Sequence, residues 1–131
     1  ARNLFRLGRY DSQFDWIQRS DRMLISAWEN SNNIRRATGW ASVLLWRSST
    51  FHELAISASS SSELQKARKK IDYKFYPQII LAGGFDNVDQ PKWMEGKYIE
   101  SGSARFFICQ EGACKLPVES LNEVDNLLKA K

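Results

Sequence analysis

The sequence predicts a mixed α/β fold, in which a helical hairpin segment precedes a small, mainly parallel sheet of three strands with flanking helices. Two observations support this prediction. Over residues 1–49, apolar side chains recur at three-, four- and seven-residue steps, the period of an amphipathic helix. From residue 50 onward, short apolar or alternating runs typical of strands are separated by helical stretches with capping signals. We therefore divide the chain into a helical segment, residues 1–49, and an α/β subdomain, residues 50–131.

Composition excludes several classes of protein. The 131 residues are 43% hydrophobic and 26% charged, which is close to globular averages. No apolar run reaches the ~20 residues of a spanning helix, and the first residues do not resemble a signal peptide, so we expect no membrane partner. Two cysteines and one histidine make no disulfide framework, which favours a reducing, cytoplasmic setting. The net charge of +4 is too small to identify an anionic partner, and no cofactor is predicted.

The helical segment shows helical spacing from its first residues, without a preceding cap. Asp11 or Ser12 is expected to cap a second helix, in which Phe14, Ile17, Leu24 and Trp28 share one face. A polar loop should then lead into a third helix. The expected elements are helices over residues 3–10, 13–29 and 35–47 and a loop over residues 30–33.

Tryptophan is unusually abundant in this segment. Four of the five tryptophans lie in the first 46 residues: Trp16, Trp28, Trp40 and Trp46. A large aromatic side chain buries about 150–250 Å², and two or three helices have too little interior to cover four of them. We expect another part of a larger protein, or a second copy of the chain, to cover this aromatic helical face.

The α/β subdomain begins with a strand–helix–strand unit. Its helix has a capping box, Ser60 with Glu63, and a second box, Ser120 with Glu123, precedes the last helix. A parallel βαβ arrangement is the expected result. The expected elements are strands over residues 51–57, 78–82 and 105–109, and helices up to residue 73, over 91–94 and over 121–128.

The two cysteines are separated by four residues. We interpret them as structural, with Cys109 buried on a strand as a small hydrophobic residue and Cys114 in the loop that follows. The alternatives are a redox pair, a disulfide across the turn and half of a metal site. The spacing differs from the C-x-x-C of redox motifs and zinc knuckles, and His52 is the single histidine, so no metal site is predicted.

A serine run and two glycines follow the first two strands of the subdomain. Because the carboxyl ends of parallel strands and the starts of helices attract anionic ligands, an anion site at this edge is one interpretation. The competing interpretation is that the serines act only as caps and turn residues, since no Gly-x-Gly-x-x-Gly fingerprint is present. The candidate anion-binding residues are Ser57, Ser59, Ser60, Gly83 and Gly84.

A basic helix adjoins three aromatic residues. Contact with nucleic acid through phosphates and stacking is one interpretation, but we expect a solvated helix face whose aromatics are anchored in the core, and no nucleic-acid partner. The residues concerned are Lys66, Arg68, Lys69, Lys70, Lys74, Tyr73, Phe75 and Tyr76.

Other polar residues give no catalytic site. His52 and Glu53 are neighbours on an expected strand, so their side chains should point to opposite faces, which argues against an acid–base pair. Asp86 and Asp89 are interpreted as solvated loop carboxylates. We therefore predict no catalytic residue in this chain.

Several segments occur together in an order that resembles a known family. They are residues 3–8, 55–56, 75–82, 96–97 and 107–109, Cys114, and residues 117–118. In these segments the chain resembles the C-terminal end of the thioredoxin-domain-containing, spermatogenesis-associated protein family. The resemblance implies a longer protein, with an N-terminal thioredoxin-like domain and an (α/α) toroid similar to six-hairpin glycosidases. Residues 1–49 would then be the last hairpins of the toroid, and residues 50–131 a C-terminal appendage.

Three functions follow from these expectations. The first is a non-catalytic role in packing and interdomain contacts, with the remainder of the longer chain as partner. The second is part of a carbohydrate-active enzyme, which would require two carboxylates about 5–10 Å apart across a pocket. The third is an anion- or nucleic-acid-binding module.

Overall fold

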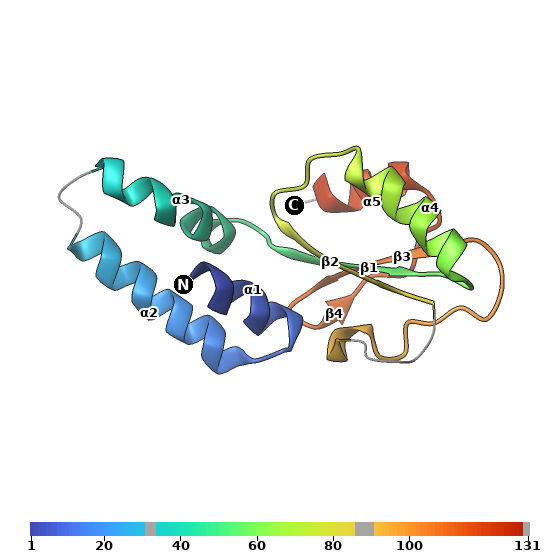
Figure 1. Cartoon of the computed structure of the whole chain (residues 1–131), viewed down its shortest axis with the longest axis horizontal. Coiled ribbons are helices and arrows are strands. Elements are labelled where there is room, and N and C mark those ends of the chain that lie inside the picture. Colours follow the sequence, from blue (N-terminus) through green and yellow to red (C-terminus); the bar gives the residue numbers. More distant parts are fainter. Residues whose placement is uncertain (31–33, 86–90, 130–131) are drawn as a thin grey trace. The chain divides into compact units, whose positions relative to one another are not determined.

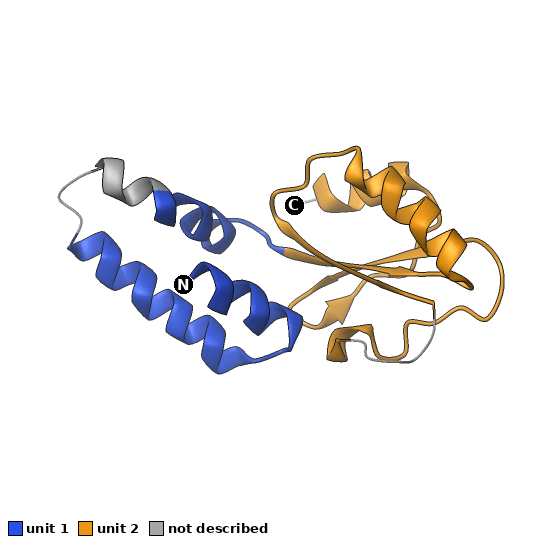
Figure 2. Cartoon of the chain, in the orientation of Figure 1, with its two compact units in different colours: residues 1–51 blue, residues 52–131 orange. Residues whose placement is uncertain are grey.

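A computed structural model describes residues 1–30, 34–85 and 91–129, and the side chains of the third helix from residue 39 onward. The chain consists of two compact units, Ala1–Phe51 and His52–Lys131 (Figure 2). The predicted boundary, between residues 49 and 50, lies two residues earlier. The mixed α/β class is confirmed by five α-helices and a four-stranded sheet among the described residues.

Unit 1 is helical and is organised around Phe5. The Phe5 ring is fully buried, and its centroid lies 5.7 Å from that of Trp46 and 5.0 Å from that of Phe51. Ile17 and Leu24 are buried as predicted. The helices, labelled in Figure 1, are α1 (Arg2–Tyr10), α2 (Phe14–Glu29) and α3 (Ile34–Ser48).

Two residues predicted for the inner face of α2, Phe14 and Trp28, are instead exposed. Helix α1 has nine residues whereas α2 has sixteen, and α1 contacts the N-terminal part of α2, so its length accounts for the exposure of Trp28. Phe14 is the first residue of α2, about 60° around the helix from Ile17.

The link between α1 and α2 depends on close backbone contact at Gly8. The main-chain N–H of Gln13 donates to the carbonyl of Gly8 at 2.8 Å. A Cβ atom at Gly8 would lie 2.8 Å from Ile17 Cγ1 and 2.9 Å from the Gln13 carbonyl oxygen, so only glycine fits without a shift.

The predicted cap at Asp11 or Ser12 is wrong. Ser12 adopts a left-handed turn conformation with φ +55°, so the helix starts after it and Gln13 occupies the N-cap position. The Gln13 side chain makes no capping hydrogen bond.

Unit 2 contains a sheet in the order β2-β1-β3-β4. The strand–helix–strand prediction is confirmed, since β1 and β2 are parallel and α4 lies between them in sequence. The prediction of a three-stranded, mainly parallel sheet is wrong, because β3 is antiparallel to β1 and β4 is antiparallel to β3. The elements are β1 (His52–Ser57), α4 (Ser61–Asp72), β2 (Ile79–Gly84), η1 (Lys92–Met94), β3 (Arg105–Gln110), β4 (Ala113–Cys114) and α5 (Leu121–Lys129).

The register explains why β3 runs in the opposite direction. Gly84, the last residue of β2, and Arg105, the first residue of β3, both lie opposite Ser57. The connection between them therefore starts and ends at the same edge of the sheet. A parallel third strand would need a crossover to the other edge, usually an α-helix, and the described part of this connection contains only the short 3₁₀-helix η1.

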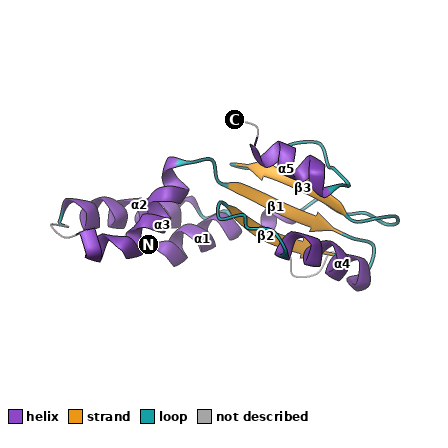
Figure 3. Cartoon of the chain, turned by 90° about the horizontal axis from the view of Figure 1, so that it is seen from above, coloured by secondary structure: helices purple, strands orange, loops and turns teal. Residues whose placement is uncertain are grey.

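Helices α4 and α5 cover one face of the sheet, and η1 lies on the opposite side (Figures 1 and 3). The core beneath the two helices contains Leu54, Ile56 and Ile108 from the sheet, Ile71 from α4 and Val124 from α5.

Both predicted capping residues act as caps. Ser60 Oγ accepts from the N–H of Glu63 at 3.3 Å. In the second capping box Ser120 Oγ accepts from the N–H of Glu123 at 3.3 Å, and the Ser120 N–H donates to Glu123 Oε2 at 3.1 Å.

We predict that Gly8→Ala lowers the free energy of unfolding of unit 1 by about 1–3 kcal/mol, because the added methyl group overpacks the α1–α2 contact. Urea unfolding followed by tryptophan fluorescence measures this change. Gly39→Ala is the matched control. A Cβ atom at Gly39 meets nothing within 4 Å, and alanine in a helix interior should raise stability by up to about 1 kcal/mol. Equal losses in both variants would contradict the prediction.

Candidate functional site

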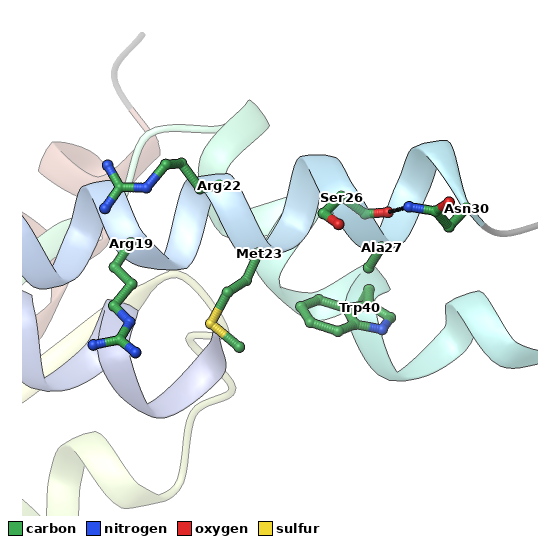
Figure 4. Close-up of a pocket in the computed structure, with 7 residues that line it drawn as sticks. All are labelled: Arg19, Arg22, Met23, Ser26, Ala27, Asn30 and Trp40. Atoms are coloured by element: carbon green, nitrogen blue, oxygen red, sulfur yellow. Dashed lines mark hydrogen bonds between the residues drawn. The ribbon is translucent and has the colours of Figure 1, made fainter.

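A groove lies between α2 and α3 in unit 1 (Figure 4). We call it the α2–α3 groove. Its volume is about 610 Å³. In Figure 4, Met23 and Ala27 of α2 lie on the side that faces Trp40 of α3. At the end of α2, Asn30 Nδ2 donates to the Ser26 carbonyl at 2.7 Å. The lining residues are Arg19, Arg22, Met23, Ser26, Ala27, Asn30 and Trp40.

The rim of the groove is cationic. Arg19 and Arg22 are exposed, and neither guanidinium forms an ion pair or hydrogen bond with a residue in the described part of the chain. Arg19, Arg22 and Met23 stand three and four residues apart, which places them on neighbouring parts of the helix surface. An apolar floor with a positive rim suits an amphipathic segment with acidic side chains.

This groove was not expected from the sequence. Trp40 was expected to be one of four tryptophans that the helical segment cannot cover by itself, and Arg19 and Arg22 were not singled out. The apolar pair Met23 and Ala27, beside the buried Leu24, was the available signal. The approach of Trp40 to this pair depends on how α2 and α3 pack, which periodicity does not reveal.

The two cysteines form a disulfide, so the favoured interpretation of separate thiols is wrong. Cys109 is buried on β3 as expected, but Cys114 lies on β4 rather than in a loop. The two residues are directly opposite each other, with Cα atoms 3.9 Å apart. The pairing arises from a two-residue turn in which Glu111 has φ +52° and Gly112 φ +83°, as in a type I′ hairpin. The Glu-Gly pair midway between the cysteines was the sequence signal for this hairpin.

The structure brings the candidate anion-binding residues to one edge of the sheet, because Ser57 lies opposite Gly84. Two of the three serine hydroxyl groups have hydrogen-bond partners, whereas the buried Ser57 Oγ has none among the described residues. Ser59 Oγ donates to the Gly102 carbonyl at 3.2 Å, and Ser60 Oγ caps α4. Leu54 and Ile56 face α4, so strand alternation directs the buried Ser57 side chain to the opposite face. Anion binding at this edge stays a prediction.

Two of the aromatic residues beside the basic helix are not anchored in the core. Tyr73 is 91% exposed and Phe75 is 88% exposed. Helix α4 ends at Asp72, and its buried positions are Ala67 and Ile71, so Tyr73 and Phe75 lie beyond the helical stripe that faces the sheet. Tyr76 is half-buried.

The basic side chains of α4 are partly neutralised. Lys66 pairs with Glu63 at 2.7 Å, and Arg68 pairs with Asp72 at 3.5 Å. Lys69 and Lys70 are exposed and have no ion-pair partner within the described residues.

His52 and Glu53 are both buried and lie on opposite faces of the sheet, as the alternation predicted. Burial, and after it the charge of Lys115, lowers the pKa of His52. Glu53 lies opposite Cys109 in the sheet. Burial lowers the pKa of Lys97, and the charge of Glu53 partly offsets this lowering. Asp86 and Asp89 lie outside the described residues. Among the residues that are described, no three His, Cys, Asp or Glu side chains form a group that could hold a metal ion.

Comparison of the chain with protein families, with curated proteins and with solved structures gives no match in any of the three. None of the helices in the described part of the chain has the length and apolar character needed to cross a bilayer.

We predict that the protein, denatured without reductant, takes up no alkylating label, and that it takes up two labels after reduction. Mass spectrometry of the intact chain distinguishes the two states. Reduction should also lower the free energy of unfolding of unit 2 by about 2 kcal/mol, because the disulfide restricts the unfolded chain and the loop that it closes is short. A double variant, Cys109→Ala with Cys114→Ala, should not change in stability when reductant is added. Two labelled thiols before reduction would overturn the disulfide.

Proposed function

We propose that this chain has a non-catalytic packing role, in which the helical unit contributes an interface to the remainder of a longer protein. The observation that supports the proposal is the number of large apolar side chains exposed on α1, α2 and α3. They range from 38% exposed for Trp16 to 68% exposed for Phe14. These residues are Leu7, Phe14, Trp16, Met23, Ile25, Trp28, Leu44 and Leu45.

The distribution of these residues on α2 supports neighbours on two sides. Ile17 and Leu24 mark the stripe buried within unit 1. At about 100° per residue, Trp16 and Met23 fall on one flank of this stripe, and Ile25 falls on the other. A helix with apolar flanks on both sides of its buried stripe suits an array of helices more than the edge of a small bundle. Burial of one such side chain stabilises a protein by about 1.5–3 kcal/mol, so covering several is a large driving force.

The covering element that we propose is a helix of the (α/α) toroid implied by the sequence resemblance. The α2–α3 groove offers such a helix an apolar floor at Met23, Ala27 and Trp40. The rim residues Arg19 and Arg22 would select acidic side chains on its flank.

A part in a carbohydrate-active enzyme receives less support. Neither the α2–α3 groove nor the cavity beside His52 is lined by a pair of carboxylates, and the latter contains Asp125 alone. Glycoside chemistry in most families requires two.

The test is co-purification of the 131-residue chain with the helical region of the longer protein, expressed as a separate polypeptide. We expect a complex by size-exclusion chromatography, and we expect Met23→Lys to weaken it about tenfold, because a charge enters the apolar floor. Leu116→Lys is the matched control, since Leu116 is 86% exposed in unit 2 and does not line the groove.

Two outcomes would contradict the proposal. Absence of any complex would remove the packing role. Dimerisation of the 131-residue chain alone, abolished by Met23→Lys and retained in Leu116→Lys, would assign the groove to a second copy instead.

A further inference from the structure

A small cavity opens in unit 2 where β1 and β2 begin. We call it the His52 pocket. Its volume is about 200 Å³, and residues from the two strands, from the α4–β2 connection and from the end of α5 line it. These residues are His52, Phe75, Tyr76, Pro77, Gln78, Ile79, Asp125, Leu128 and Lys129.

His52 is the buried polar group of this pocket. Only 6% of the residue is exposed, and no residue in the described part of the chain hydrogen-bonds to its Nδ1. Burial and the charge of Lys115 both disfavour the imidazolium ion and lower the pKa of His52. The neutral ring has one donor and one acceptor nitrogen. A buried imidazole with an unsatisfied nitrogen is costly unless a ligand or water completes it.

Tyr76 and Asp125 form a fixed wall on one side. Tyr76 Oη donates to Asp125 Oδ1, and Lys74 Nζ pairs with Asp125 Oδ2. The hydrogen bonds from Lys74 and Tyr76 lower the pKa of Asp125, so this carboxylate is ionised and already neutralised by Lys74. Burial and the bond to Asp125 raise the pKa of Tyr76, which keeps its hydroxyl protonated. The tyrosine ring is therefore held in place as part of the pocket.

The remaining walls are mostly apolar, with Gln78 as a further polar residue, and Lys129 lies at the rim. Phe75, Pro77, Ile79 and Leu128 supply flat or aliphatic surface. Phe75 is 88% exposed, so its ring is accessible to a ligand at the mouth of the pocket. Lys129 lines the pocket and forms no ion pair with a described residue, although its charge contributes to the lowered pKa of Asp125.

We propose that the His52 pocket binds a small planar ring that carries an anionic group. The ring would lie against Phe75, Tyr76 and Leu128, with one edge toward the His52 imidazole and the anionic group toward Lys129. The volume is below the 300–1,000 Å³ of common ligand pockets, which limits the buried part of the ligand to about one ring.

A single-stranded nucleic acid on the outer surface is the competing interpretation. Such a strand would stack on Tyr73 and use the free charges of Lys69 and Lys70, none of which lines the pocket. Binding of a small ring depends on the residues that line the pocket and should not depend on Tyr73, Lys69 or Lys70.

An NMR titration with benzoate tests the proposal. The chain has one histidine, so its imidazole signals are assigned without variants. We expect saturable shifts of the His52 ring and of the Leu128 and Lys129 amides. Benzamide, a neutral analogue of the same shape, should bind about tenfold more weakly because it lacks the charge attracted to Lys129.

Two pairs of variants complete the test. Phe75→Ala and Lys129→Met should each weaken benzoate binding about tenfold. The control variants Tyr73→Ala and Lys70→Met also remove an exposed aromatic ring and an exposed lysine, but from outside the pocket. They should change the affinity for benzoate by no more than about twofold. All four side chains are exposed, so circular dichroism should show an unchanged fold.

The proposal is overturned by any of three results. These are the absence of a saturable His52 shift with benzoate, equal affinity for benzamide, and losses in Tyr73→Ala and Lys70→Met as large as those in the pocket variants. The last result would assign binding to the outer basic surface.

Discussion

Strand β1 pairs with β2 on one side and β3 on the other, and all six of its residues are buried. Its main-chain hydrogen bonds therefore hold the centre of the sheet, while its side chains contribute to both faces. Leu54 and Ile56 form the core beneath α4 and α5, and Glu53 and Ser57 are buried on the other face. His52 and Ser57 are the first and last residues of β1, so they lie at opposite ends of the strands. The surroundings of both polar residues therefore depend on the register of β1 with its neighbours.

The hairpin of β3 and β4 completes this sheet and changes the expected chemistry of the cysteines. The positive φ angles at Glu111 and Gly112 turn the chain so that Cys114 meets Cys109 across the two strands. Disulfides persist in oxidising compartments and are rare in the cytosol. The pairing and the cytoplasmic setting expected from composition thus point in opposite directions.

The two units present surfaces of different kinds. Unit 1 has large apolar side chains on both flanks of α2 and an open groove with two arginines, which suits a helix from a protein partner. Unit 2 has a smaller cavity in which a neutral imidazole, a fixed tyrosine and a lysine converge. The two proposed binding surfaces share no residue.

Local sequence determined the helices, the capping serines and the parallel β1–β2 pair, because helical period, cap residues and apolar runs act within a few neighbouring positions. The opposite faces of His52 and Glu53 followed from the same local rule. Tertiary structure alone decided the direction of β3, since that depends on the edge to which a long connection returns. It also decided the exposure of Phe14 and Trp28, the approach of Trp40 to Met23, and the meeting of Tyr76 with Asp125 across 49 positions of sequence. These contacts depend on packing between distant segments, for which no period or spacing in the chain provides a signal.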